Sequence, residues 1–136
     1  MRQFLRAKIH KATVTEANLD YIGSITIDAD LLERTGIAEY ERLLIVDNTN
    51  GARLETYALE GTRGSGIICM NGAAAHLVAT GDEIIIMAFE YADQPPKDPR
   101  QVLVDHKNRF VRLLGHDDEG PSEEARHPAP QTSQQE

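Results

Sequence analysis

Alternation of apolar and polar residues at every second position is the feature that most constrains the fold of this chain. Near the N-terminus, Leu5, Ala7 and Ile9 alternate with polar neighbours, as expected of a strand with one buried face. Alternating or continuous apolar runs predict further strands over 42–48, 52–59, 66–70, 83–90, 101–105 and 109–114. Asn50-Gly51, between two of these runs, predicts a tight turn.

Helical patterning is short by comparison. Asp28 or Asp30 can cap a helix that continues through Leu32 and stops at Gly36. A second short helix is predicted over 71–78, ending before a glycine. Many short strands and two short helices within residues 1–114 favour a mainly β fold, and a small β-barrel in particular.

The C-terminal part of the chain has a different composition. Residues 1–94 contain no proline, and all six prolines follow. Residues 115–136 carry six acidic residues and one basic residue, and their only apolar residues are two alanines. Such a segment cannot bury enough apolar surface to offset the entropy of ordering it. We therefore expect a folded region over 1–114 and a disordered tail over 115–136.

Charge and composition exclude several classes of function. The chain has 14 basic and 22 acidic residues, a net charge of −8, which disfavours binding to nucleic acid or to an anionic membrane surface. No apolar run approaches the roughly 20 residues of a membrane span, and the N-terminus lacks the apolar region of a signal peptide. The single cysteine, Cys69, forbids an intrachain disulfide, and the five histidines show no ligand spacing. We expect a cytoplasmic protein without a metal site.

Gly23-Ser24 has two interpretations. The ordinary one is a turn, which is what most Gly-Ser pairs form. In the other, the Ser24 hydroxyl attacks the carbonyl of Gly23, which no side chain shields and whose backbone can adopt strained dihedrals. The resulting ester can eliminate to a dehydroalanine, which hydrolyses to a pyruvoyl group at the new N-terminus. Gly-Ser alone does not decide between the two.

Arg53 and Tyr57 share one face of a predicted strand. A guanidinium there could bind a carboxylate in a bidentate manner, and a phenol could give a proton to a carbanion. A solvated arginine and a half-buried tyrosine are the ordinary alternative. Thr56 falls on the opposite face, so a bulge or a subunit boundary would be needed to bring Thr56 and Tyr57 into one site.

Three other features each have an ordinary structural interpretation. Asn71-Gly-Ala-Ala-Ala75 after an apolar strand could offer free backbone N–H groups to an anion, or form a simple turn. Lys8 and His10 on one strand face suit a solvated sheet edge. Cys69 lies in an apolar run, which favours a core position over a nucleophile.

Taken together, these residues resemble the pyruvoyl-dependent aspartate 1-decarboxylase family over about residues 1–90. The motifs that carry the resemblance are Lys8-Ile-His10, Tyr21-Ile-Gly-Ser24, Thr49-Asn-Gly-Ala-Arg53, Thr56-Tyr57, Arg63-Gly-Ser65 and Asn71-Gly-Ala-Ala-Ala-His76. The resemblance implies a double-psi β-barrel and self-cleavage between Gly23 and Ser24. Residues 1–23 would become the β chain, and the α chain would begin at Ser24, with its barrel part over 24–114.

The resemblance also implies roles for individual residues. Ser24 becomes the covalent pyruvoyl group, which forms a Schiff base with L-aspartate, and Tyr57 is the proton donor. Gly23, Ser24, Thr56 and Asn71 match positions of the self-processing step. The substrate-binding positions are Lys8, Arg53, Thr56, Gly72, Ala73 and Ala74.

The implied activity is decarboxylation of L-aspartate to β-alanine and CO2, which feeds pantothenate biosynthesis. The implied assembly is a homotetramer of processed protomers, with four α and four β chains. A separate maturation factor is possible but not expected. A barrel that serves as a binding module is the competing class, and it would keep the Gly23–Ser24 bond intact.

Overall fold

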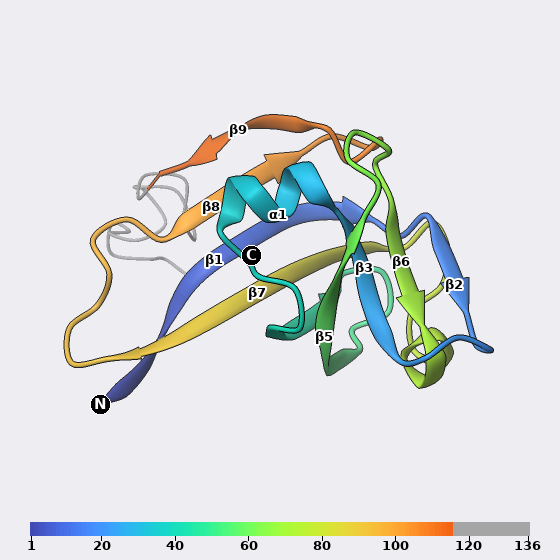
Figure 1. Ribbon diagram of the computed structural model, residues 1–136, viewed down its shortest axis with the longest axis horizontal. Coiled ribbons are helices and arrows are strands. Elements are labelled where there is room, and N and C mark those ends of the chain that lie inside the picture. The colour runs from blue at the N-terminus through green and yellow to red at the C-terminus, as the bar shows by residue number, and fades with distance from the viewer. Residues whose placement is uncertain (116–136) are drawn as a thin grey trace, which may run out of the picture.

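The computed structural model describes residues 1–115, and most of its regular structure is β (Figure 1). The predicted tail lies outside the described residues except for Gly115. The described residues contain one α-helix, α1 (Ala29–Thr35), and one 3-10 helix, η1 (Gly72–His76). The strands are β1 (Arg2–Thr13), β2 (Glu16–Asn18), β3 (Ser24–Asp28), β4 (Arg42–Asp47), β5 (Arg53–Gly61), β6 (Ile68–Asn71), β7 (Glu83–Ala92), β8 (Arg100–Val104) and β9 (Phe110–Leu114).

The strands close into a barrel because the N-terminal segment has two neighbours. The sheet order is β2-β6-β3-β5-β4-β7-β1-β8-β9. β1 and β2 are separated by only two residues, so this one segment pairs with β7 at one end and with β6 at the other. Between them, the Val14 amide donates to Asp82 and the Thr15 amide donates to Ile68. The segment therefore joins the two ends of the strand order.

Two parallel pairings give the barrel its connectivity. β2 runs parallel to β6, and β3 runs parallel to β5, while the remaining barrel pairings are antiparallel. Because of these two pairings, β2 and β3 alternate with β6 and β5 in the strand order, as in a double-psi β-barrel. β8 and β9 form a hairpin that is added to β1 from outside the barrel (Figure 1). The expected mainly β, double-psi barrel class is confirmed.

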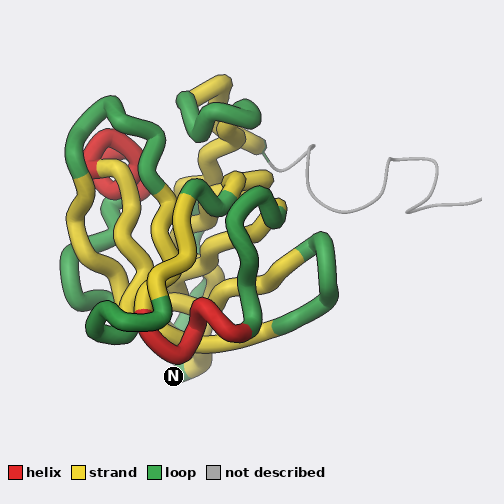
Figure 2. Tube along the Cα trace, turned by 90° about the vertical axis from the view of Figure 1, so that its right-hand side faces the viewer, coloured by secondary structure: helices red, strands yellow, loops and turns green. Residues whose placement is uncertain are grey.

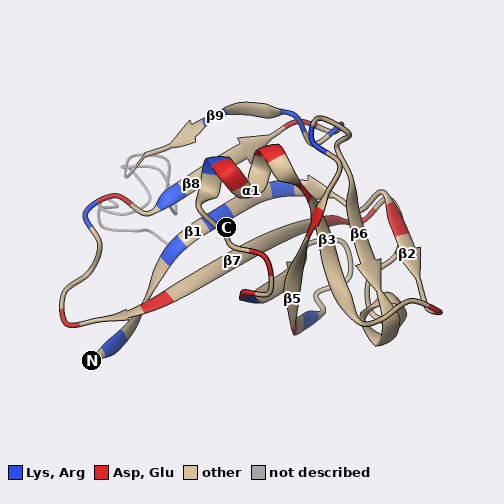
Figure 3. Cartoon of the chain, viewed as in Figure 1, with Lys and Arg blue, Asp and Glu red and all other residues tan. Residues whose placement is uncertain are grey.

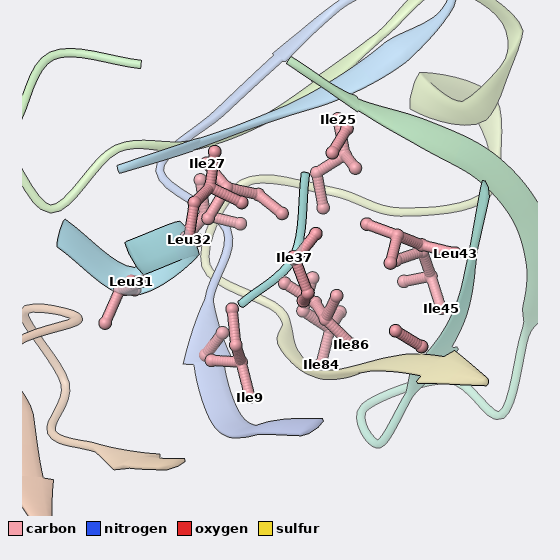
Figure 4. Packing of buried hydrophobic residues seen from close by; sticks show 14 of the residues in the cluster. Ile9, Ile25, Ile27, Leu31, Leu32, Ile37, Leu43, Ile45, Ile84 and Ile86 are labelled. Carbon is pink, nitrogen blue, oxygen red and sulfur yellow. The ribbon is translucent and has the colours of Figure 1, made fainter. Parts of the chain in front are cut away.

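The barrel interior is filled by branched aliphatic side chains. Figure 4 shows Ile9, Ile25, Ile37, Leu43 and Ile86 converging from different segments. All five are at most 4% exposed. Each such side chain contributes roughly 1.5–3 kcal/mol when it leaves water. The predicted alternation of β1 is confirmed at Ala7 and Ile9, both of which are fully buried.

The two helical predictions differ in outcome. α1 begins after Asp28, whose side chain accepts a hydrogen bond from the Asp30 amide, and ends at Gly36 with a positive φ of 75°, as predicted. The second predicted helix, over 71–78, forms as η1, a 3-10 helix of five residues that is shorter than predicted. α1 and η1 lie near opposite ends of the barrel (Figure 2). No helix within residues 1–115 is long and apolar enough to cross a membrane.

Two buried carboxyl groups join the loops at one end of the barrel. Asp47, at the end of β4, is 1% exposed, and Asp82, just before β7, is 9% exposed. Asp47 Oδ1 accepts from the amides of Thr49 and Asn50, and Asp82 Oδ2 accepts from the amide of Ala79. Burial and a hydrogen bond with Asp82 raise the pKa of Asp47, and that same hydrogen bond lowers the pKa of Asp82. In the pH range between the two pKa values, the pair therefore binds a single proton.

The two pKa shifts predict that the free energy of unfolding falls toward higher pH, through Asp47, and toward lower pH, through Asp82. Asp47 contributes stability below its ordinary pKa, and that contribution is lost as the pH rises through its raised value. Asp82 contributes above its ordinary pKa, and that contribution is lost as the pH falls through its lowered value. Asp47→Asn keeps a donor toward Asp82 at every pH. We expect it to remove the loss on the higher-pH side, about 1 kcal/mol or about 4 °C in Tm, in a series of melting curves against pH.

Asp98→Asn, at an exposed position, is the matched control and should leave the pH dependence of the wild type unchanged. Parallel Tm curves for the wild type and Asp47→Asn on the higher-pH side would contradict the shared proton.

Candidate active site

Ser24 is the first residue of β3 and directly follows an exposed loop. Tyr21 and Ile22 are 54% and 73% exposed, whereas Ser24 is fully buried. The Ser24 hydroxyl lies 3.3 Å from the Ile22 carbonyl oxygen, to which it can donate. The Asn71 amide nitrogen Nδ2 donates to Ser24 Oγ over 2.9 Å. The hydroxyl next to the Gly23–Ser24 bond is therefore fixed by partners on both sides.

The strand register explains why Asn71 meets Ser24. In the antiparallel β3–β6 pair, Ser24 lies opposite Asn71, and Thr26 lies opposite Cys69. Residues that lie opposite each other share a face of the sheet, so these four side chains form one group, named here the β3–β6 polar group. Asn71 Nδ2 also donates to Thr26 Oγ1 over 3.1 Å, and Cys69 Sγ donates to Asn71 Oδ1 over 3.1 Å.

Two members of this group were not predicted as site residues. Thr26 was not singled out, and Cys69 was interpreted as a core residue. Cys69 is indeed buried, but it lies on the face of β6 opposite to Ile68 and Met70, which join the hydrophobic core. The spacing of two between Ser24 and Thr26, and between Cys69 and Asn71, was the signal that could have identified them.

Gly72 packs directly on the Gly23–Ser24 junction. Its φ is +69°, and a Cβ built there would lie 2.6 Å from Gly23 Cα and 2.8 Å from the Gly23 nitrogen. Only glycine fits this backbone conformation at this distance. Gly23 is not among the glycines with a positive φ, and a Cβ on Gly23 would meet only the Asn71 carbonyl oxygen at 3.9 Å. The unusual backbone therefore belongs to Gly72 rather than to Gly23.

A hollow of about 400 Å³ lies beside this junction. It brings together six residues predicted for the site, and three others, Leu54, Glu55 and Leu77, complete its lining. The six are Gly23, Thr56, Tyr57, Asn71, Ala73 and Ala74. Ser24 and Gly72 are buried behind this lining. The hollow is the size of a small-molecule site.

Thr56 and Tyr57 border the same hollow from opposite faces of β5. Thr56 pairs with buried Leu43, and Tyr57 pairs with exposed Arg42, in a β4–β5 register that has no shift. A bulge therefore does not bring them together. The Tyr57 ring lies against the Tyr40 ring, with centroids 6.3 Å apart and planes tilted by 35°, which restricts its position.

Arg53 and Lys8 do not line the hollow. Arg53 is exposed and pairs with Val46, whose neighbours along β4 are buried, so Arg53 lies on the outer face of the sheet. Lys8 lies between the buried Ala7 and Ile9 on β1, the strand that carries several positive residues in Figure 3. Two strands, β7 and β4, separate β1 from β5. One copy of the chain therefore does not bring Lys8 to the hollow.

The segment after Asn71 is held by a contact from the 47–52 loop. Asn50 Nδ2 donates to the Leu77 carbonyl oxygen over 2.8 Å, just after η1. The Asn71 side chain makes no capping hydrogen bond to η1, because its amide is engaged with Ser24 and Thr26. The predicted Asn50-Gly51 turn thus fixes one wall of the hollow.

The hollow has a limited set of charged groups. No lysine or arginine of residues 1–115 lines it, and its one carboxylate, Glu55, forms an ion pair with Arg42. Among the same residues, no group of three or more His, Cys, Asp or Glu side chains is arranged to hold a metal ion. Burial, followed by the charge of Glu16, raises the pKa of the Cys69 thiol, so it remains a protonated donor.

A barrel with a buried serine beside a small-molecule hollow suits an enzyme or a binding module, and comparison with known proteins identifies the family. A family model described as aspartate decarboxylase matches residues 1–111. The chain belongs to the aspartate decarboxylase family and is an enzyme of this kind. Aspartate 1-decarboxylases of Bacillus cereus strain B4264 and Bacillus thuringiensis strain Al Hakam are each 48% identical over 122 residues, which cover 88% of this chain and 96% of theirs.

Solved structures were also compared. Two rationally designed proteins, mkDPBB_sym_86 and mkDPBB_sym1, are 14% and 16% identical, with TM-scores of 0.46 and 0.42. They span 60% and 58% of this chain, and 95% and 93% of their own chains. The double-psi connectivity of this barrel follows from its own strand pairings.

Proposed function

We propose that this chain is a proenzyme that cleaves itself between Gly23 and Ser24 and then decarboxylates L-aspartate to β-alanine and CO2. The observation that supports this most strongly is the buried Ser24 hydroxyl, 2.9 Å from Asn71 Nδ2, at the end of an exposed loop. An ordinary Gly-Ser turn needs neither burial nor an amide donor. Membership of the aspartate decarboxylase family supports the substrate.

The cleavage requires only groups of the chain and one water molecule. Ser24 Oγ attacks the Gly23 carbonyl carbon, and the peptide nitrogen leaves it, so that an ester replaces the amide. Loss of the Ser24 α-proton and of the Gly23 carboxylate then leaves a dehydroalanine. Water replaces its nitrogen, which leaves as ammonia, and the product is a pyruvoyl group. The Asn71 N–H would stabilise negative charge on Oγ as its proton leaves.

The residues around Ser24 fit such a group. Asn71 Nδ2, which now donates to the hydroxyl, would donate equally to a carbonyl oxygen. The small residues Gly72, Ala73 and Ala74 keep the adjoining wall free of bulky side chains. The pyruvoyl group would supply a ketone that condenses with the amine of aspartate and accepts the electrons released with CO2.

The remaining catalytic work falls on side chains of the hollow. Tyr57 lies on its wall, with its ring held against Tyr40, and its phenol can give a proton to the carbon that loses the carboxylate. Thr56, Ala73 and Ala74 line the space in which the substrate would bind. Thr56 also borders Gly23 across the hollow, which suits a role in self-processing.

A homotetramer of processed protomers would complete the site. Aspartate carries two carboxylates, but no cationic side chain of the described residues lines the hollow. Arg53 and Lys8 lie on the outer face of the barrel, and neither forms an ion pair within residues 1–115. Packing of that face against a second copy would bring cations to the substrate. We place the enzyme in the cytoplasm, where its β-alanine would feed pantothenate synthesis.

Arg53→Ala tests the binding half of this proposal. We expect KM for L-aspartate to rise about 10- to 100-fold, because a charge-assisted hydrogen bond to a carboxylate contributes roughly 1.5–3 kcal/mol. Self-cleavage should be unchanged, since Arg53 does not line the hollow beside Gly23. Steady-state kinetics on fully cleaved protein separate KM from kcat.

Arg109→Ala is the matched control, because Arg109 is also exposed but lies in the turn between β8 and β9, outside the barrel. An unchanged KM in Arg53→Ala, or an equal rise in both variants, would remove Arg53 from substrate binding.

A further inference from the structure

The cysteine of the β3–β6 polar group has no part in the reaction described above. Cys69 is 5% exposed and lies opposite Thr26, two pairs along the ladder from Ser24 and Asn71 and on the same face. Its Sγ lies 3.1 Å from Asn71 Oδ1. The thiol therefore contacts the one side chain that donates to the Ser24 hydroxyl.

Asn71 can act on Ser24 only in one orientation of its amide. With Nδ2 toward β3, it donates to Ser24 Oγ and Thr26 Oγ1. With the amide turned over, Oδ1 would face both hydroxyls, and no N–H would be left to stabilise charge on Ser24 Oγ. The Ser24 hydroxyl favours this orientation only through its 3.3 Å contact with the Ile22 carbonyl oxygen, and Thr26, whose hydroxyl can donate or accept, does not select between the two.

Cys69 adds a second and closer contact that selects the orientation, at 3.1 Å from Asn71 Oδ1. A thiol donates to a carbonyl oxygen more readily than it accepts from an amide, because sulfur is a weak acceptor. A protonated thiol beside the amide therefore favours Oδ1 on its side and Nδ2 on the side of Ser24.

We propose that Cys69 is a positioning residue, whose thiol holds the Asn71 amide in the orientation that directs Nδ2 to Ser24 Oγ and thereby sets the rate of self-cleavage. This role rests on the self-cleavage half of the proposed function. It assigns to Cys69 no contact with substrate and no covalent chemistry.

Two pairs of variants test the role, each pair matched in shape and different in its donor. Cys69→Ser keeps a donor that Cys69→Ala lacks, and Cys69→Thr keeps a donor that Cys69→Val lacks. The measurement is the first-order rate at which freshly purified full-length precursor is converted to two chains, followed by intact mass. We expect each variant without a donor to cleave about tenfold more slowly than its partner with a donor.

Ile68→Val separates positioning from stability. Ile68 lies on the core face of the same strand, so the variant should lower Tm without changing the cleavage rate at a temperature where it is folded. Melting curves identify which variants are folded, and the Thr and Val pair serves if the smaller side chains destabilise the barrel.

The outcomes separate the two proposals. If the wild type cleaves and the two members of each matched pair cleave at equal rates, the role of Cys69 is overturned. The proposed function is then unaffected. A wild-type chain that never cleaves would overturn both. Slower cleavage only in the variants without a donor would support the role.

Discussion

Replacing Ser24 by alanine is expected to leave a single uncleaved chain with no decarboxylase activity above background. Alanine removes the only oxygen that can attack the Gly23 carbonyl from this position, and with it the source of the pyruvoyl ketone. Ser24→Ala should still fold, because the change removes one atom from a buried position and leaves Asn71 its hydrogen bond to Thr26. Intact mass and CO2 release measure the two expected losses.

Ser65→Ala provides the matched control for this variant. Ser65 also follows a glycine, but it is exposed, and its hydroxyl donates to the Thr62 carbonyl oxygen within the same loop. It should cleave and turn over as the wild type does. Normal cleavage of Ser24→Ala would show that the hydroxyl is not the nucleophile.

Tyr57→Phe is expected to lower kcat by about 10²- to 10⁴-fold while cleavage still goes to completion. The variant keeps the ring that lies against Tyr40 and removes only the phenolic proton. Because the ring and the lining of the hollow are retained, KM should change much less than kcat. Steady-state kinetics on protein shown by intact mass to be fully cleaved provide the measurement.

Tyr91→Phe is the control for the loss of a phenol, since Tyr91 is 68% exposed at the far end of β7. Tyr40→Phe retains the ring contact with Tyr57 and should also be active. A normal kcat in Tyr57→Phe would remove Tyr57 from the protonation step.

The sequence predicts a strand well where apolar and polar residues alternate and only one face of the strand is buried. β4 and β7 were predicted within a few residues of their bounds, because their buried residues repeat with a period of two. β5 was also predicted within a few residues of its bounds, although Ala58 is its one buried residue. β3 was missed although Ser-Ile-Thr-Ile-Asp also alternates. In this strand the polar face is buried as well, so its alternation does not separate a core face from solvent. β2 has only three residues, too few for a period to be recognised.

The segment 71–78 shows how tertiary contacts override local preference. Three consecutive alanines favour an α-helix. Gly72 instead takes a left-handed backbone so that it can pack on Gly23, and Asn71 gives its side chain to Ser24 rather than to a helix cap. With its start altered in this way, only a 3-10 segment forms.

The candidate site was predictable to a similar extent. Motif resemblance selected six of the residues that line the hollow, from Gly23 to Ala74, because these lie in short segments of fixed spacing. Thr26 and Cys69 could not be assigned to it, since their place depends on the antiparallel register of β3 with β6, which only the fold defines. The separation of Lys8 from the hollow likewise depends on the strand order.

The intact mass of the purified, denatured wild-type chain tests the central claim most directly. We predict two chains divided between Gly23 and Ser24, the larger of which is lighter by one ammonia than a chain that begins with serine. A larger chain that keeps its serine would contradict the pyruvoyl group. A single chain that stays uncut after warm incubation, with and without host extract, would contradict self-cleavage and point instead to a barrel that only binds its ligand.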